Sequence, residues 1–410
     1  MTSCPYTTHQ GRLEVTPGYF PIAYCREGCG RTFFVCTRCQ EANRPLARYC
    51  RNCSEPISFT AVQAQQEIVR PLQEGRTESS KLSDYGVREV LALKAYKGFL
   101  IVVGEQSVLI YDLHKVHEPL YQFQPPDGRV VRGITLVSTE TDEQVLVTTS
   151  RSVYRLSLLT LQPEDSPVYE AGAGRYITQP VVYCAGQLYG LVMDEGARSS
   201  QLVRLSERDS ILSFDGIGRS LLRLSGERFF FCTQDQVFLY DDGKVRQQRF
   251  PEQFTEAEAA YSAPLDTVYL VSESGLWRLT VAGGELTLVS LPTRVLGAPR
   301  LAAGGDHVYV AHAQGFLVLD PFGGVRWDSA QQFIRAESDG LNPQANEQYV
   351  LFTALGLNGG SDLRIHPVNN WNDFKTHVYE QRLLCPPLFT LGRILSATGG
   401  TGTVMLSCVM

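Results

Sequence analysis

Two pairs of cysteines stand near the start of the chain, and each pair has the spacing C-x-x-C. Cys36 and Cys39 form the first pair, and Cys50 and Cys53 form the second pair, ten residues further on. Two turns of this kind let four thiolates converge tetrahedrally on Zn²⁺, while main-chain N–H groups bond the sulfur atoms. Zinc binding would contribute on the order of 10 kcal/mol to the folding of so small a unit. The spacing therefore predicts a zinc site.

Four cysteine ligands leave no coordination position open for water or for a substrate, so the predicted site is structural and not catalytic. The competing interpretation is that these cysteines are free thiols or form disulfides. Seven of the eleven cysteines fall in the first 53 residues, and the other four are scattered singly. A secreted disulfide framework would spread pairs through the fold, whereas a tight cluster in a reducing compartment indicates a metal.

A further pair of cysteines lies upstream, with a strand-like run after it. The spacing between Cys25 and Cys29 is typical of a second zinc-binding turn, which would need two more ligands. Cys4 and His9 are the residues left over to supply them. A site of three cysteines and one neutral histidine is chemically ordinary. We expect one structural Zn²⁺, and a second if these four residues form a site.

The composition is that of an ordinary soluble protein. The 410 residues are 43% hydrophobic and 20% charged. No apolar stretch reaches the length of about 18 residues that a transmembrane helix needs. The start of the chain lacks the basic and apolar regions of a secretory signal. We expect a cytoplasmic protein with no membrane span.

The charge is unevenly distributed along the chain. Residues 1–60 contain seven Arg and four Glu, which gives them a net charge of +3. Because the whole chain has a net charge of −6, the remaining residues have a net charge of −9. Contacts to phosphate groups need clustered Lys and Arg side chains. The acidic remainder is therefore a poor platform for nucleic acid, and only the N-terminal module could contact it.

The rest of the chain repeats with a period near 40 residues. Each repeat contains an apolar hexapeptide of similar pattern, preceded by two strand-like runs and followed by a more polar one. The eight copies are SVLIYD (107–112), SVYRLS (152–157), QLVRLS (201–206), QVFLYD (236–241), GLWRLT (275–280), GFLVLD (315–320), DLRIHP (362–367) and TVMLSC (403–408). Four short strands per repeat, joined by tight turns, are typical of a β-propeller blade.

We therefore predict an all-β fold, an eight-bladed β-propeller preceded by a small zinc-ribbon module. A pair of β-sandwiches, the main competitor, would not produce eight even copies. Seven blades are the alternative, if the stretch 331–382 is partly an insertion. The predicted organisation is a zinc-ribbon module at 1–56, a linker at 57–84 and the propeller at 85–410.

The last repeat ends immediately after its third strand, which would leave that blade with an exposed edge. We expect a segment upstream of the first blade to supply the missing fourth strand. The two strand-like stretches there are PISFTAV (56–62) and EIVRPL (67–72). Such a strand would make the linker part of the propeller.

The cysteine segment resembles the zinc ribbons of bacterial multidomain proteins, including double zinc ribbons. In these ribbons an Asn-Pro-like turn and an aromatic residue precede the third cysteine, and Asn43, Pro45 and Tyr49 occupy those positions. The spacing is also similar to that of RanBP2-type zinc fingers, which bind ubiquitin or single-stranded RNA. Phe34 replaces the tryptophan of those fingers, and Gln40-Glu41 replaces the Thr-Phe of the ubiquitin-binding class. The resemblance implies a metal more strongly than it implies a partner.

The stretch VLDPFGGVRW (318–327) resembles the repeat of PQQ-like propellers, which are related in architecture to WD40 propellers. PQQ-dependent dehydrogenases bring a pair of adjacent cysteines, and this chain has none. The sequence also lacks the G-x-S-x-G, H-E-x-x-H and EF-hand patterns. We expect a protein that is not an enzyme.

The favoured interpretation is a non-catalytic protein-interaction scaffold or adaptor whose partners are other proteins of one complex. A first alternative is a nucleic-acid-binding adaptor that acts through the basic module; it predicts binding that depends steeply on salt. A second alternative is a small-ligand sensor or enzyme that uses the central mouth of the propeller. The sequence by itself does not identify the partners.

Overall fold

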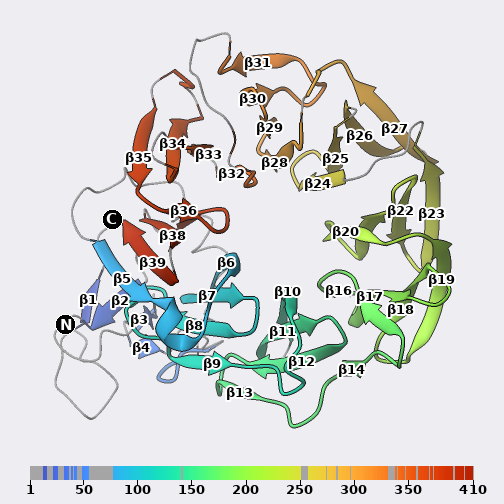
Figure 1. Cartoon of the computed structure of the whole chain (residues 1–410). Helices are drawn as coiled ribbons and strands as arrows, with labels where there is room; N and C mark the ends of the chain where they lie inside the picture. Colours follow the sequence, from blue (N-terminus) through green and yellow to red (C-terminus); the bar gives the residue numbers. More distant parts are fainter. Residues whose placement is uncertain are drawn as a thin grey trace. The chain divides into compact units, whose positions relative to one another are not determined.

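The structure is a computed structural model, and Figure 1 shows its strands in chain order. It describes residues 13–15, 22–25, 32–36, 38–39, 41–43, 49–54, 77–139, 142–250, 257–273, 275–282, 285–295, 297–330, 338, 340–346, 348–356, 359–368, 370–372, 374–390, 393–400 and 402–409. The chain forms two compact units, which are Met1–Gln124 together with Pro387–Met410, and Pro125–Pro386.

The first unit contains the N-terminal sheet and two of the larger sheets. The N-terminal sheet has the order β1-β2-β3-β4, with β1 (Leu13–Val15), β2 (Ile22–Cys25), β3 (Thr32–Val35) and β4 (Ala42–Asn43). The next sheet is formed by β6 (Val90–Tyr96), β7 (Phe99–Gly104), β8 (Val108–Asp112) and β9 (Tyr121–Phe123). The last sheet contains β37 (Leu388–Thr390), β38 (Arg393–Gly400), β39 (Thr403–Val409) and β5 (Thr77–Lys81).

The second unit contains six antiparallel sheets. Their strands are β10 (Val131–Ser138), β11 (Glu143–Thr149), β12 (Ser152–Ser157), β13 (Gln162–Pro163) and β14 (Tyr169–Glu170); β15 (Arg175–Ile177), β16 (Val182–Cys184), β17 (Gln187–Asp194), β18 (Ser199–Arg204) and β19 (Asp209–Asp215); β20 (Arg219–Arg223), β21 (Arg228–Cys232), β22 (Gln236–Asp241) and β23 (Lys244–Arg249); β24 (Ala257–Ser262), β25 (Thr267–Ser272), β26 (Gly275–Ala282) and β27 (Glu285–Leu291); β28 (Arg300–Gly304), β29 (His307–His312), β30 (Gly315–Leu319) and β31 (Val325–Asp328); and β32 (Gln344–Ala345), β33 (Tyr349–Leu355), β34 (Ser361–Pro367) and β35 (Lys375–Tyr379). The short strand β36 (Arg382–Leu383) follows them in the chain.

The fold is an all-β, eight-bladed β-propeller, as the repeat predicts. The eight repeated hexapeptides coincide, to within two residues at either end, with the third strands β8, β12, β18, β22, β26, β30, β34 and β39. The seven-bladed alternative is wrong. The stretch 331–382, which it treated as partly an insertion, contains β32, β33, β34 and β35 and so forms a blade of its own.

The fourth strand of the last blade comes from upstream of the first blade. Strand β5 pairs antiparallel with β39, with Ser79 opposite Ser407 and Lys81 opposite Met405. The sequence favoured 56–62 or 67–72 for this role, and that choice is wrong, because β5 occupies the position beside β39; the two stretches themselves lie outside the described residues. A 3-10 turn, η1 (Leu82–Tyr85), follows β5 and ends at Gly86, whose φ of 75° suits a residue without a side chain.

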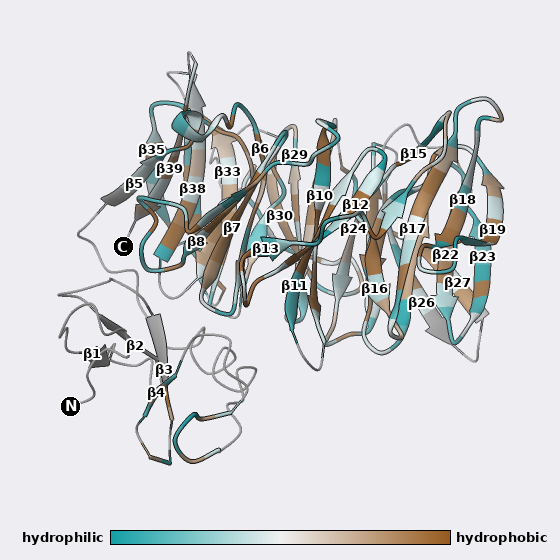
Figure 2. Cartoon of the chain, turned by 90° about the horizontal axis from the view of Figure 1, so that it is seen from below, coloured by the Kyte–Doolittle hydropathy of each residue, from teal (hydrophilic) through white to brown (hydrophobic). Residues whose placement is uncertain are grey.

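The apolar core of the second unit lies between adjacent blades. One cluster, for example, joins Phe214 and Tyr189 of one blade to Phe231 of the next. The middle strands supply most of it, because both of their faces are covered by neighbouring sheets. Figure 2 shows the result: β7, a middle strand of the first unit, is coloured as apolar, and its six residues are all buried.

Two further properties bear on the sequence predictions. In the part of the chain that the structure describes, no helix has the length and the apolar character needed to cross a membrane. The eight cysteines whose side chains the structure describes are all free thiols. Four of them, Cys184, Cys232, Cys385 and Cys408, are buried single residues of the propeller, where a thiol packs as a small apolar group.

Candidate metal centre

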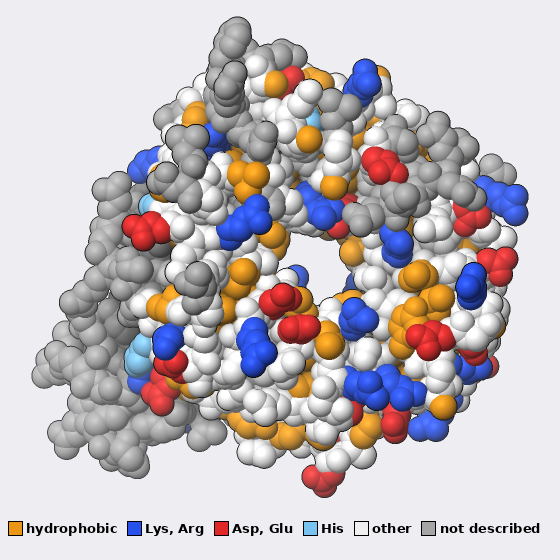
Figure 3. All heavy atoms as spheres, viewed as in Figure 1, with side chains coloured by type: hydrophobic (Ala, Val, Ile, Leu, Met, Phe, Trp, Pro, Cys, Tyr) orange, Lys and Arg blue, Asp and Glu red, His pale blue; other side chains and the backbone are white. Residues whose placement is uncertain are grey.

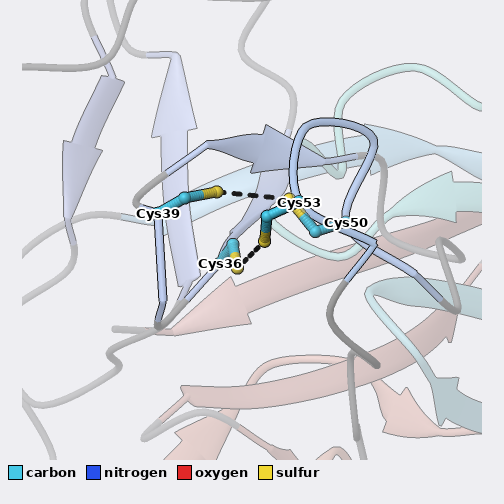
Figure 4. A group of neighbouring side chains, drawn as sticks. All are labelled: Cys36, Cys39, Cys50 and Cys53. Atoms are coloured by element: carbon cyan, nitrogen blue, oxygen red, sulfur yellow. Dashed lines mark hydrogen bonds between the residues drawn. The ribbon is translucent and has the colours of Figure 1, made fainter.

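The N-terminal sheet positions the first two predicted ligands. Val35 of β3 pairs with Ala42 of β4, and both side chains are buried. The chain must therefore reverse direction between them, and the amide of Cys36 closes this turn by donating to the carbonyl of Glu41 at 2.9 Å. Cys36 and Cys39 lie on the turn, and a second turn carries the other two cysteines toward them (Figure 4).

The four thiols converge on one point. The Sγ atoms of Cys36, Cys39, Cys50 and Cys53 all lie within 4.8 Å of one another. The Sγ atoms of Cys36 and Cys53 are 3.6 Å apart, and those of Cys39 and Cys50 are 3.4 Å apart. A tetrahedron with metal–sulfur bonds of about 2.3 Å has edges of about 3.8 Å. The described thiols therefore fit a metal ion that takes four sulfur ligands.

Asn43 connects the two cysteine turns. Its side-chain amide donates to the carbonyl of Glu41 at 2.8 Å and to the Sγ of Cys50 at 3.6 Å. Its side-chain oxygen accepts the amide of Arg51 at 2.8 Å. Groups that hold a ligand from outside the first coordination shell fix its orientation and raise metal affinity. The sequence placed Asn43 in a turn, but only the structure shows this bridging role.

The surroundings of Cys50 favour its thiolate form. Burial raises the pKa of the Cys50 thiol, but the backbone N–H groups of Cys53 and Asn52 lower it, as do the side chains of Cys39 and Asn43. The net result is a pKa of about 6, below the usual 9.0 of a thiol. The thiolate is the form that binds a metal, so these surroundings favour the metal-binding form of Cys50.

Among the described residues, the outer side of the centre is polar apart from Tyr49. Arg51 binds the carboxylate of Glu41 through its guanidinium group, which ties the two turns together on their outer side. The Tyr49 side chain, which directly precedes the third cysteine, is 63% exposed. The role of Tyr49 therefore lies at the surface of the module and not in its core.

The second predicted metal site falls largely outside the described residues. Cys4, His9 and Cys29 lie outside them, and the backbone of Cys25 forms the end of β2 while its side chain is not described. The structure therefore brings together four of the eight predicted ligands. A second zinc ion remains a prediction.

Elsewhere in the described residues, the ionisable groups do not gather into a comparable centre. The four thiols are the one group of three or more His, Cys, Asp or Glu residues there that could hold a metal ion. His366 is completely buried among aromatic rings, with Phe374 stacked at 4.7 Å and Trp327 edge-on at 5.1 Å. Its Nδ1 lies 2.7 Å from the carbonyl of Trp371. These contacts give His366 a place in the core.

Comparisons with known proteins support the fold. No protein-family model matches the chain, and no curated protein matches it. Among solved structures, BamB from Moraxella catarrhalis aligns with a TM-score of 0.55 and 12% sequence identity, covering 83% of this chain and 100% of that one. BBS1N, solved in complex with ARL6DN, aligns with a TM-score of 0.44 and 12% identity, covering 83% of this chain and 98% of that one. At this identity the likeness to BamB shows the fold alone.

Proposed function

We propose that this chain is a non-catalytic scaffold that binds other proteins of one cytoplasmic complex, and that its four-cysteine centre holds a structural Zn²⁺. The observation that carries the proposal is the completeness of the thiol centre. Four sulfur ligands satisfy a tetrahedral ion and leave no position for a reacting molecule. The centre therefore supports a fold, and the surface around it is left for binding.

The distribution of charge and of apolar groups is consistent with protein partners. On the face seen in Figure 3, Lys and Arg side chains are interspersed with Asp and Glu among the described residues. A nucleic-acid platform would need one continuous basic area. Large apolar side chains are nevertheless exposed, including Val378 and Phe322. Exposed apolar groups with mixed charges around them suit a protein partner.

The identity of the metal is tested by elemental analysis of the purified full chain. We expect one equivalent of zinc that is lost in Cys50→Ser and kept in Cys184→Ala, a control that changes a buried thiol of the propeller. A second equivalent that disappears in Cys25→Ser would establish the second site. A chain that binds no zinc after purification in zinc-containing buffer would contradict the proposal.

The scaffold function is tested by isolating the tagged full chain from its native cells without denaturation. We expect one or more proteins in fixed stoichiometry, retained after nuclease treatment and at about 0.5 M salt, where exposed charge pairs are screened. An isolated monomer, or a partner removed by nuclease, would contradict the proposal. The second result would favour the nucleic-acid adaptor.

A further inference from the structure

The outer strands of the blades differ in how well their free edges are protected. A free edge with unpaired N–H and C=O groups invites another strand, and proteins commonly block it with charges, bulges or short length. Among the described outer strands, β9 and β31 are short, and β23 carries three charged side chains in the sequence KVRQQR. Strand β19 has an Asp at each end and a register shift against its neighbour.

Strand β27 has a charged residue only at its first position, Glu285, and it is neither short nor interrupted by a bulge. Its sequence is ELTLVSL, and its seven residues pair with β26 without a register shift. It is the last strand of its sheet (Figure 1), and its outer edge has no strand partner among the described residues. Its residues have the high β-propensity and low charge that favour addition of a further strand.

An apolar patch lies beside this edge. Val289 of β27 is 38% exposed, Phe322 is 68% exposed and Val325 is 48% exposed. Phe322 belongs to the next blade, on the turn Asp320–Gly324, and this turn packs on the end of β27: a Cβ added to Gly323 would lie 2.8 Å from the Cβ of Leu291. The patch is therefore continuous with the edge of β27.

Several hydrogen bonds hold the backbone of the turn that carries Phe322. The Asp320 carboxylate accepts the amides of Phe322 at 2.9 Å and Gly324 at 2.8 Å. The Thr293 hydroxyl donates to the carbonyl of Gly323 at 2.5 Å, and Gly323 has a φ of 85°. The backbone at Phe322 is therefore already ordered, so binding a partner there does not have to order the turn.

Arg278 adds a positive charge to the patch, next to the Asp320–Arg326 ion pair (3.3 Å) that flanks Phe322 and Val325. Its guanidinium lies over the Phe322 ring at 4.8 Å, and Arg278 stands opposite Val289 in the β26–β27 pairing. No carboxylate forms an ion pair with it among the described residues, and its buried Nε has no hydrogen-bond partner there. A cation on an apolar surface with an unused donor favours a carboxylate from outside.

We propose that the edge of β27, with Val289, Phe322, Val325 and Arg278, is the docking surface for an extended segment of a partner protein. The segment adds as a strand to β27, covers Phe322 with an apolar side chain and places an acidic side chain on Arg278. This inference rests on the proposed scaffold function and names one of its surfaces together with the chemistry of the partner.

The probe is a library of displayed random 12-residue peptides, selected on the immobilised full chain. Enriched peptides are labelled with fluorescein, and their affinity is measured by anisotropy for the wild type, Val289→Lys and Arg278→Glu. Val378→Lys is the matched control, because Val378 is an exposed valine, 71% accessible, on the outer strand β35 of another blade. Hydrogen exchange reports whether the peptide protects the β27 amides.

We expect acidic and β-branched residues to be enriched in the selected peptides. Affinity should fall about tenfold or more in Val289→Lys and Arg278→Glu and stay unchanged in Val378→Lys. Changing the acidic residue of a peptide to Lys should restore its binding to Arg278→Glu. Failure to select any peptide, or selection of peptides that bind both variants normally and leave β27 unprotected, overturns the inference.

A second measurement separates this inference from the scaffold proposal. The native-cell isolation is repeated with Val289→Lys, after circular dichroism has shown that the variant is folded. Loss of the partner supports docking on β27. A partner that is retained in full overturns the β27 inference and leaves the scaffold function standing, whereas a wild type without any partner contradicts the scaffold function itself.

Discussion

The module that carries the four clustered cysteines and the second unit bury their apolar side chains to very different extents. In the module, few apolar side chains are buried among the described residues, Val35 and Ala42 being two of them. In the second unit, aromatic rings such as those of Tyr189 and Phe229 pack between neighbouring sheets, with ring centroids 4.9 Å apart. A module that buries so little apolar surface has little to offset its conformational entropy, so we expect a bound metal to stabilise it. The blades need none, because each one covers its neighbour.

Metal removal should produce the largest difference between the two regions. We expect a strong chelator to unfold the segment around Cys36–Cys53, because the ion contributes on the order of 10 kcal/mol to such a module. The thermal transition of the propeller should not move. Limited proteolysis checks the first result and calorimetry the second. Readdition of zinc is the control, and continued protection of the segment after complete metal removal would contradict the expectation.

The converse experiment removes an aromatic ring from the propeller. Phe231 is completely buried and stacks on Phe238 at 4.6 Å. Phe231→Ala should lower the free energy of unfolding by about 3–5 kcal/mol, because it leaves a cavity. Zinc content should be unchanged. Phe322→Ala, at an exposed ring, is the control, and an effect of Phe231→Ala below about 1 kcal/mol would show that the site collapses around the smaller side chain.

Acid should weaken the propeller through His366. Burial lowers the pKa of His366 to about 4, an effect that the carbonyl of Trp371 partly opposes and Arg364 adds to. The unfolded chain takes up the proton near pH 6.5 and the folded chain does not. The buried, neutral His366 therefore makes its full contribution to the free energy of unfolding above about pH 6.5. Up to about 3 kcal/mol of this contribution is lost as the pH falls toward 4.

Urea unfolding at pH 7, 5.5 and 4.5 measures this dependence. The variant His366→Phe has no proton to take up and keeps an aromatic ring among Trp327, Phe352 and Phe374. Its free energy of unfolding should fall less over the same pH range. Parallel curves for wild type and variant would assign the acid sensitivity to other groups.

The smallest expected effect concerns Asn43, which holds the two cysteine turns together. Asn43→Ala removes the bonds to Glu41, Cys50 and Arg51 and should weaken metal binding about 10- to 100-fold. The stability of the propeller should not change. Competition with a chelator of known affinity measures the loss. Asn52→Ala, at an exposed neighbour, should bind as the wild type does, and equal affinities for both variants would assign no role to the side chain of Asn43.

The repeat predicted the blades well because the third strands are buried on both faces. Strands such as β8 must then be apolar almost throughout, as VLIYD is, and this pattern is visible in a single sequence. The closing strand was harder to predict. Strand β5 reads TESSK, without a run of apolar residues. It is stabilised by main-chain bonds to β39, which depend little on side-chain type.

The proposed docking surface at β27 could not be predicted from the sequence. Arg278 and Phe322 are 44 positions apart, and the packing of one blade on the next brings them within 4.8 Å. The lack of an ion-pair partner for Arg278 among the described residues is likewise a property of its neighbours in space. The LTLVSL run could be identified as a strand, but its place at the edge of a sheet followed from the pairing of four strands.

The sequence by itself determined the metal-ligand spacing, the period of the blades and the all-β fold, because each depends on the types and intervals of residues close together in the chain. Tertiary structure alone decided which strand completes the last blade, how Asn43 joins the cysteine turns and which strand edge stays open. These features depend on contacts between residues that are distant in sequence. Such contacts form, and stabilise the protein, only when the sheets have packed against one another.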